Sequence, residues 1–212
     1  QGEISLGLVM RISLPGRLAT GGPVPDPAYG LQLSERALPG LKPEGHVKVR
    51  YEELEGTYTD GEGYSLRRPI YDIVELGAGP LSPETRFSPR VAPAVHGLGL
   101  LAAVEDEILR AQADPEDADG DGISGKVNLV WDYEGKKLVM GRFGWKANQP
   151  SLRQQTAGAF VGDLGITSPL FPDENHTSSY ADLHKFVRPP GDNGPELSGK
   201  ILQRVTAYLQ TL

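Results

Sequence analysis

The chain has 212 residues, 38% of them hydrophobic, which is enough for one substantial core or two small ones. Its net charge of -7 argues against a nucleic-acid partner, because such binding needs clustered Lys and Arg side chains. The absence of cysteine excludes disulfides, thiolate metal sites, a cysteine nucleophile and covalent attachment of c-type haem within this chain.

The backbone should be irregular over long stretches, because the chain has 27 glycines and 18 prolines, many of them within residues 19–45. No apolar run approaches the roughly 20 residues that span a bilayer, so we expect no membrane span. We expect no signal peptide at the start of this sequence, and a start at Gln1 rather than Met leads us to expect a processed or excised piece.

The first part of the chain predicts strands. The apolar stretch 4–14 indicates one, and the alternation of apolar and polar residues over 46–53 indicates a second. Residues 66–76 can return beside the second strand after a turn at Asp60-Gly61. We expect these three segments to form a small antiparallel sheet.

The second part predicts helices. Leucine, isoleucine and valine recur at helical spacing over 98–109, which predicts one helix that ends before Pro115. Residues 127–131 and 137–140 can pair as a short hairpin across Glu134-Gly135.

Two further helices are expected, from Leu152 to about Val161 with Ser151 as N-cap, and over residues 197–209. The last helix carries four apolar residues on one face, namely Ile201, Leu202, Val205 and Leu209. We place a soft boundary between a strand-rich region, 1–90, and a helical region, 91–212, which could also form one domain.

The sharpest chemical motif is Asp117-Ala-Asp-Gly-Asp-Gly, the front half of a calcium loop. The predicted ligands are Asp117, Asp119, Asp121, the backbone carbonyl of Ile123, and Asn128 at position 12, where an EF-hand has Glu. The neutral Asn128 favours a weak or structural calcium site over a sensor. An acidic surface turn without metal is the alternative.

Several segments in order resemble one family: residues 88–101, 117–125 and 166–175, with Gly141-Arg-Phe-Gly-Trp-Lys-Ala and Gln149-Pro-Ser-Leu-Arg-Gln-Gln-Thr-Ala. Residues 21–27 and 49–53 fit as well, so the resemblance covers nearly the whole chain. The family is that of the di-haem oxidoreductases, also labelled thiol oxidoreductases, which are relatives of the bacterial di-haem cytochrome c peroxidases.

The resemblance implies an α+β fold, with cytochrome c-like helices, a small antiparallel sheet inserted before them and long Pro/Gly-rich loops. Family members attach two haems through Cys-x-x-Cys-His motifs, largely outside the region matched here. The chain is therefore expected to be the central part of a periplasmic or cell-envelope c-type di-haem oxidoreductase with peroxidase-like electron transfer. Its haem c would be attached outside this sequence, and its partners would be flanking haem-bearing segments or chains and a small-molecule oxidant or electron donor.

Two residues are candidates for catalysis. In the peroxidases that this chain resembles, a Trp between the haems relays electrons, which implies that role for Trp145; the alternative is a buried aromatic with a paired indole N–H. His96 could be a distal ligand or an acid–base group, or a half-buried histidine with satisfied hydrogen bonds.

Three residues are candidates for cofactor binding. Met140 could be an axial thioether or core filler. Arg142 and Arg153 would suit haem propionates or the carboxylates of the calcium loop, with solvated surface charges as the alternative. His176 and His184 stand where the family leads us to expect cysteines, and they are either a metal-binding pair or two surface imidazoles.

Two other functional classes were weighed. A calcium-stabilised binding or interaction module without redox activity is compatible with the acidic loop and the lack of cysteine. A hydrolase is disfavoured, because neither Gly-x-Ser-x-Gly nor His-Glu-x-x-His occurs in the sequence.

Overall fold

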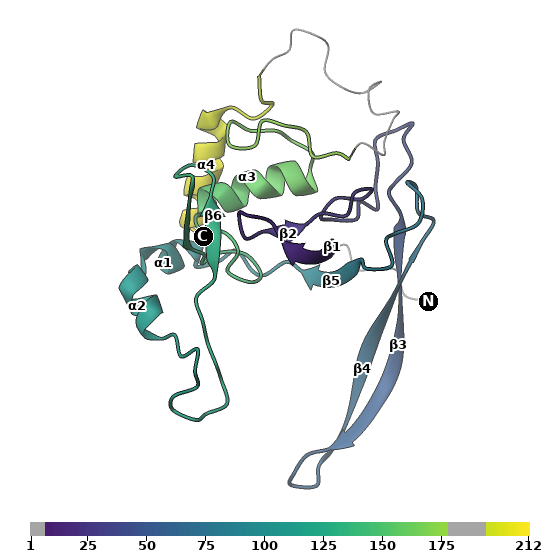
Figure 1. Cartoon of the computed structure of the whole chain (residues 1–212), viewed down its shortest axis with the longest axis vertical. Helices are drawn as coiled ribbons and strands as arrows, with labels where there is room; N and C mark the ends of the chain where they lie inside the picture. The colour runs from purple at the N-terminus through teal and green to yellow at the C-terminus, as the bar shows by residue number, and fades with distance from the viewer. Residues whose placement is uncertain (1–6, 178–193) are drawn as a thin grey trace. The chain divides into compact units, whose positions relative to one another are not determined.

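The computed structural model describes residues 7–177 and 194–212, which form two compact units (Figure 1). Within the described residues, unit 1 comprises 7–14, 25–91 and Thr177, and unit 2 comprises 15–24, 92–176 and 194–212. Each unit contains its own cluster of buried apolar side chains.

A small three-stranded sheet has the order β2–β1–β5. Its members are β1 (Leu8–Arg17), β2 (Pro23–Val24) and β5 (Arg86–Val91), and β1 and β5 are antiparallel. Successive side chains of a strand point to opposite faces, so Met10 and Ile12 share one face of β1, where each is 2% exposed. These two residues lie in the core of unit 1, which also contains Tyr29, Leu33 and Val47.

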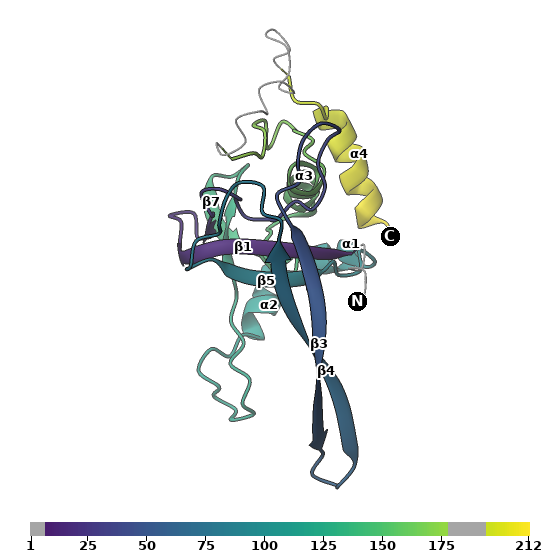
Figure 2. The same cartoon turned by 90° about the vertical axis from the view of Figure 1, so that its right-hand side faces the viewer.

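The strands β3 (His46–Thr57) and β4 (Gly63–Val74) form a long antiparallel hairpin in unit 1. Only the end near His46 enters the core, where Val47 is 1% exposed. Further along, Tyr51 is 56% and Leu54 41% exposed. Figures 1 and 2 show this part of the hairpin as a twisted two-stranded ribbon.

A buried carboxylate fastens the loops of unit 1. Asp26 is 2% exposed, and its Oδ1 accepts hydrogen bonds from the backbone N–H groups of Ala28 (2.9 Å) and Tyr29 (3.2 Å). Its Oδ2 accepts a bond from the hydroxyl of Thr85 at 2.9 Å. This carboxylate therefore joins two loops that are far apart in the sequence. Its hydrogen bonds offset the free-energy cost of burying a polar group.

The Tyr29 hydroxyl makes a second connection between the same loops. It donates a hydrogen bond to the carbonyl of Gly79 and accepts one from the N–H of Ala78 at 3.0 Å. Burial raises the pKa of Tyr29 above its usual value, although the N–H of Ala78 lowers it part of the way. The phenol therefore stays protonated and keeps its donor at neutral pH.

Unit 2 contains the helices and one short hairpin. Its elements are α1 (Leu98–Ala103), α2 (Asp106–Ala111), β6 (Leu129–Asp132), β7 (Lys137–Met140), α3 (Leu152–Asp163) and α4 (Gly199–Gln210). The helix α3 packs against α4 around Ala157, Leu197 and Leu202. Among the described residues, no helix combines the length and apolar character that crossing a membrane requires.

The predicted fold class, α+β with cytochrome c-like helices, is wrong. The described residues contain strands and loops for the most part, with four short helices and three small antiparallel sheets. One cause is the segment 98–109, which was expected as one helix. It breaks between α1 and α2, where Val104 and Glu105 have extended ψ values of 131° and 145°.

The predicted three-stranded sheet is also wrong in its pairing. The strands β3 and β4 pair as expected, across a turn at Asp60-Gly61. However, β1 pairs with β5, a strand that contains Pro89 and that its mixed composition did not indicate. Backbone pairing between distant segments depends on tertiary packing, which a local pattern does not report.

Other local predictions are confirmed, with one correction. The hairpin β6–β7 forms as expected, and Ser151 caps α3 by accepting a bond from the N–H of Gln154 at 3.2 Å. The helix α4 begins at Gly199, after the N-cap Ser198, rather than at residue 197. Ile201 is 47% exposed, and Thr206 at 9% takes its place on the buried face.

We expect Tyr29→Phe to destabilise unit 1 by about 1 kcal/mol, because it removes the hydrogen bonds of the buried Tyr29 hydroxyl to the carbonyl of Gly79 and from the N–H of the half-buried Ala78. Urea unfolding followed by circular dichroism measures this change. Tyr58→Phe is the matched control, since Tyr58 is 57% exposed and should unfold as the unchanged chain does. Equal stabilities of the two variants would contradict the assignment.

Candidate functional site

Trp145 lies at the tip of a tight loop in unit 2. The loop leaves β7 at Gly141 and returns at Gln149, which exchanges backbone hydrogen bonds with Phe143 at 3.0 Å in both directions. Gly141 is required, because a Cβ there would lie 2.0 Å from the carbonyl oxygen of Ala147. The base of the loop is buried, with Phe143 at 3% exposure, whereas Trp145 at its tip is 52% exposed.

The side chain of Asn128 holds this loop closed. Its Nδ2 donates hydrogen bonds to the carbonyls of Lys146 (3.1 Å) and Ala147 (3.2 Å). The amide that the sequence suggested as a calcium ligand therefore takes part in positioning Trp145. The hydrogen bond from the N–H of Gly141 to the carbonyl of Asn128, at 2.8 Å, reinforces the same connection.

Arg142 joins β7 to both short helices. Its guanidinium donates to the carbonyls of Leu101 (2.9 Å), Ala102 (3.1 Å) and Val104 (2.6 Å) at the end of α1. It also forms an ion pair with Asp106 in the first turn of α2. The guanidinium thus stabilises the break between the two helices, because it satisfies carbonyls that a helix end leaves unpaired.

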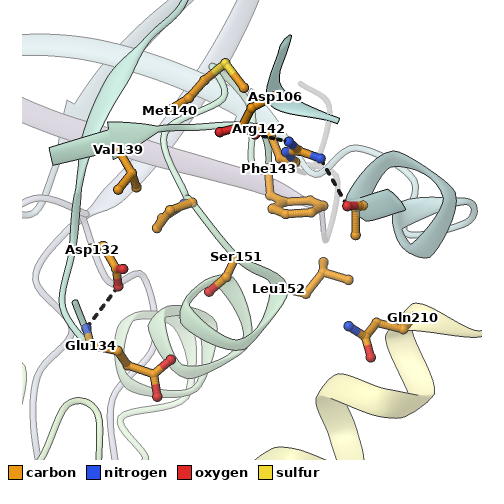
Figure 3. A pocket seen from close by; sticks show the side chains of 12 residues that line it. Asp106, Asp132, Glu134, Val139, Met140, Arg142, Phe143, Ser151, Leu152 and Gln210 are labelled. Carbon is orange, nitrogen blue, oxygen red and sulfur yellow. Dashed lines mark hydrogen bonds and ion pairs between the residues drawn. The ribbon is translucent and has the colours of Figure 1, made fainter. Parts of the chain in front are cut away.

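Met140 and Arg142 border a cavity of about 370 Å³ that is shown in Figure 3. The cavity lies against β7, the start of α3 and the end of α4. Its wall combines apolar side chains with polar ones, including the carboxylates of Asp106, Asp132 and Glu134. Met140 itself is 5% exposed. Neither His96 nor Trp145 lines this cavity, so the structure does not gather the predicted redox residues around it.

Gln154 is a buried residue of this region that sequence reasoning missed. It is 3% exposed, and its Nε2 donates to the carbonyl of Trp131 (3.0 Å) and to Oε1 of Gln149 (3.1 Å). Its Oε1 accepts a bond from the N–H of Tyr133 at 3.0 Å. A buried amide on α3 thus binds the β6–β7 hairpin and the return of the Trp145 loop. The sequence does offer one signal for Gln154, because it lies in the segment Gln149-Pro-Ser-Leu-Arg-Gln-Gln, which is one of those that carry the family resemblance.

Arg153 directly follows Leu152 of the cavity wall and pairs at 2.8 Å with Glu134, which also lines the cavity. Such partly exposed ion pairs contribute little to stability. His96 is exposed just before α1, and His176 is also exposed. His184 lies outside the described residues, so a metal site formed by the two histidines stays a prediction.

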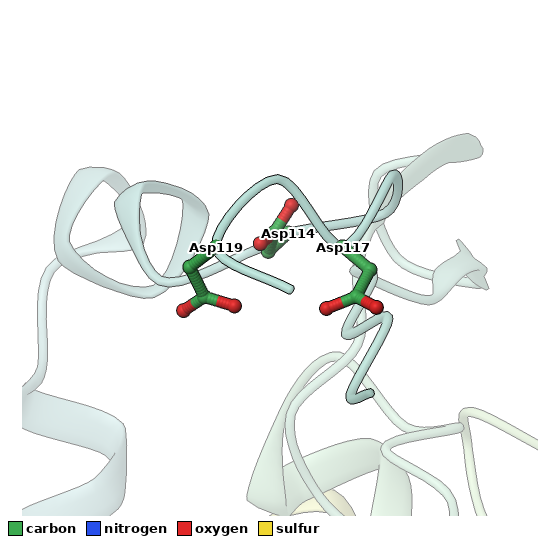
Figure 4. A group of neighbouring side chains, drawn as sticks. All are labelled: Asp114, Asp117 and Asp119. Atoms are coloured by element: carbon green, nitrogen blue, oxygen red, sulfur yellow. The ribbon is translucent and has the colours of Figure 1, made fainter. Parts of the chain in front are cut away.

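The acidic loop brings together three carboxylates, those of Asp114, Asp117 and Asp119, with potential ligand oxygens within 4.8 Å of one another (Figure 4). Asp114 precedes the predicted motif and was not expected. Asp121 is outside this group, and its carboxylate accepts the N–H of Ile123 at 2.8 Å.

The loop is also organised by its own hydrogen bonds. Oδ1 of Asp117 accepts the N–H of Gly122 at 3.1 Å, and Oδ1 of Asp119 accepts the N–H of Asp121 at 3.2 Å. Ile123 is 69% exposed, and the amide of Asn128 is engaged at the Trp145 loop. The carboxylates that converge are therefore fewer than the predicted ligand set and include one residue outside it.

Comparison with known protein families decides the identity of the chain. Residues 18–212 match the model of a family described as "Di-haem oxidoreductase, putative peroxidase". The chain belongs to the di-haem oxidoreductase family. No curated protein matches it. No solved structure matches it either.

A di-haem oxidoreductase needs iron ligands and a site that accepts the porphyrin, and we compared this requirement with the residues present. The chain has no cysteine for thioether attachment. Among the residues around the cavity, Met140 is the one with a side chain of an iron-ligating type, and three carboxylates would face the negative propionates. The residues that line this cavity therefore do not fit a haem held by this chain alone.

We expect Arg142→Lys to destabilise unit 2 by about 2 kcal/mol, because a lysine cannot bond the carbonyls of α1 and Asp106 together. Hydrogen exchange of the amides in α1 and α2 should quicken more than exchange in α3. Arg153→Lys, which changes a single partly exposed ion pair, is the matched control and should cost less than about 1 kcal/mol. Equal losses would show that Arg142 does not join the helices.

Proposed function

We propose that this chain is the part of a c-type di-haem oxidoreductase that lies between its haem-bearing segments and takes part in peroxidase-like electron transfer. The observation that carries the proposal is the family match over residues 18–212 in a chain without cysteine. Haem c would be attached outside this sequence, by flanking segments or by other chains. A periplasmic or cell-envelope location and a small-molecule oxidant or electron donor belong to the same proposal.

The Trp145 loop is the feature of this chain that best suits contact with a haem-bearing segment. Its base is fixed by Gly141, Asn128 and the bonds between Phe143 and Gln149, so the exposed indole is held on a rigid support. A large aromatic side chain that is preorganised and exposed is typical of a recognition surface. The relay role that the resemblance implies for Trp145 would be exercised across this contact.

The visible spectrum of the complete native protein, oxidised and then reduced with dithionite, tests the proposal. We expect a haem Soret band in the complete protein. We expect none from residues 1–212 produced alone in a host that matures c-type haem, because this segment has no attachment cysteine. A complete native protein without haem would overturn the proposal.

In the complete protein, we expect Trp145→Phe to lower the turnover rate about tenfold, equivalent to about 1.4 kcal/mol in the barrier. Haem content and melting temperature should stay unchanged, because Trp145 lies at an exposed loop tip. Trp131→Phe, the same substitution at the other tryptophan of this chain, is the control and should keep its turnover. Equal turnover of both variants and the unchanged protein would exclude a role for Trp145.

We also propose that the acidic loop binds a calcium ion that stabilises unit 2, with Asp114, Asp117 and Asp119 as its carboxylate ligands. Three carboxylates within ligand distance of one another, in a motif of the Asp-x-Asp-x-Asp-Gly type, support this assignment. Mutual repulsion of these carboxylates would be relieved by a divalent cation. If the complete protein lacks haem, a calcium-stabilised binding module becomes the leading function.

Calcium should raise the melting temperature of the chain, since a ligand at about 100 times its Kd stabilises the folded state by about 2.7 kcal/mol. Asp119→Asn should reduce this shift. Asp60→Asn is the control, because Asp60 makes the same kind of turn, with its Oδ1 accepting the N–H of Glu62 at 3.0 Å, in unit 1. A melting temperature that does not respond to calcium would exclude the site.

A further inference from the structure

Among the residues that the structure describes, no further strand pairs with the β3–β4 ribbon of unit 1 along its outer half. Its two strands form a sheet of their own, in which β3 has β4 as its single neighbour. An isolated two-stranded ribbon is marginally stable in water, and its unpaired backbone groups are a template for another strand. The two edges differ in their chemistry, and this difference points to a partner.

The odd-numbered residues of β3 direct their backbone groups away from β4. The N–H of Val47 donates to Oε1 of Glu35 at 2.7 Å, outside the ribbon. Backbone groups alternate between the two sides of a strand, so Val49, Tyr51 and Glu53 also present their N–H and C=O groups to the outer edge. Tyr51 and Glu53 are exposed and Val49 is half-buried. The stretch from Val49 to Glu53 contains neither proline nor glycine and can accept a strand.

The opposite edge, that of β4, is protected. Pro69 lies opposite Tyr51 in the register, and the backbone groups of such a pair are directed away from the partner strand. The nitrogen of Pro69, which carries no hydrogen, is therefore directed away from β3. Arg67 and Arg68 precede it, and both are exposed. Because the nitrogen of Pro69 carries no hydrogen, it cannot donate to an added strand, and it interrupts strand addition along the edge of β4. The ribbon therefore offers one edge, that of β3.

The distribution of charge along β3 favours an antiparallel copy of β3 itself as the strand that is added at this edge. Lys48 and Arg50 are in the first half of β3, and Glu52, Glu53 and Glu55 are in the second half. When two copies run in opposite directions, the basic half of one lies beside the acidic half of the other. A two-fold symmetric contact of this kind closes and does not propagate.

The register follows from geometry and charge. Since the outward groups belong to odd residues, odd must pair with odd, so each symmetric register is centred on one residue. A centre at Val49 would set Lys48 against Arg50, and a centre at Glu53, Leu54 or Glu55 would set glutamate against glutamate, which leaves Arg50, Tyr51 and Glu52 to compare. The first would place Arg50 opposite its own copy, and the last would do the same for Glu52, both of which are repulsive. The register centred on Tyr51 places Arg50 opposite Glu52 of the other copy, twice, on the same face of the sheet.

We propose that two copies of this chain associate through the outer edge of β3, antiparallel and centred on Tyr51. The shared ladder covers Val49 to Glu53, because the N–H of Val47 is already bonded to Glu35. It joins two ribbons into a four-stranded sheet, which is more stable than either ribbon alone. A ladder this short lies below the standard interface size of about 1,600 Å², so the dimer depends on protein concentration.

Arg50 and Glu52, which would pair across the two-fold axis, already interact with charged groups of their own ribbon. A hydrogen bond from Arg68, at 2.5 Å, lowers the pKa of Glu52, and Arg50 adds to the effect, so Glu52 is ionised at neutral pH. Arg50 lies 3.4 Å from both Glu52 and Asp72 in its own ribbon. The second copy would extend this network of exposed charges across the two-fold axis. High salt should therefore weaken the dimer.

Cysteine cross-linking tests the register directly, because the full chain has no cysteine of its own. In a hydrogen-bonded antiparallel pair the Cα atoms are about 5.5 Å apart, within the disulfide range. Tyr51→Cys should therefore give a covalent dimer on mild oxidation. Thr57→Cys, on the same face of the same strand, is the control, since the two Thr57 positions would be roughly 40 Å apart. Equal cross-linking of both variants would overturn the proposal.

Sedimentation equilibrium of charge variants tests the pairing of Arg50 with Glu52. Arg50→Glu should weaken the dimer about tenfold, because two attractive pairs become repulsive. The double variant Arg50→Glu with Glu52→Arg should return the affinity close to that of the unchanged chain. Circular dichroism verifies that each variant remains folded.

A double variant as weak as the single one would overturn the register. A chain that stays monomeric at high concentration, and whose Tyr51→Cys variant does not cross-link, would overturn the association itself. The edge of β3 would then be left for an extended strand of a different protein. Neither result bears on haem content, so this inference and the proposed function fail separately.

Discussion

The guanidinium of Arg142 is the contact on which the two short helices of unit 2 depend. It leaves the end of β7 and bonds three carbonyls of α1 and the carboxylate of Asp106 in α2. With a side-chain exposure of 10%, it replaces the water that would otherwise solvate a helix end. Arg142 lies within the base of the Trp145 loop, where its N–H donates to the carbonyl of Gln149 at 2.9 Å, so the same residue holds the base of the site.

The family of this chain and the residues that it contains differ in what they imply about haem binding. The family is one of di-haem oxidoreductases, yet this chain has neither cysteine nor a described cavity suited to a porphyrin. What it does contain is an exposed indole on a loop closed by Asn128, Gly141 and Gln149. A rigid loop of this kind can orient a contact residue without holding the cofactor, which agrees with a supporting role beside haem-bearing segments.

The two halves of the β3–β4 ribbon differ in burial and in what stabilises them. Its residues near His46 are packed into the core of unit 1, but its outer half has exposed aromatic and aliphatic residues together with basic and acidic side chains. Tyr64 covers Gly56, where a Cβ would lie 2.3 Å from the tyrosine hydroxyl oxygen, and its ring lies 4.8 Å from that of Tyr58. The ribbon is thus stabilised by side-chain pairs across its strands, while within residues 7–177 and 194–212 no strand pairs with the outer edge of β3.

Sequence alone determined the features that depend on neighbouring residues and on long motifs. It identified the family, the β6–β7 hairpin, the turn at Asp60-Gly61 and the cap of α3 at Ser151, because turn and cap chemistry acts over a few residues. It also located the acidic loop, although the convergence of Asp114 with Asp117 and Asp119 depends on how the loop turns.

Only the tertiary structure decided the rest, because the responsible contacts join residues far apart in the chain. Arg142 lies about 40 residues after the helix break that it stabilises, so the apolar periodicity of 98–109 could not reveal that break. The pairing of β1 with β5, the position of Asn128 beneath the Trp145 loop and the burial of Gln154 have the same origin. Local patterns report propensity and the direction of apolar faces, whereas strand partners and buried hydrogen bonds are set by the packing of the whole unit.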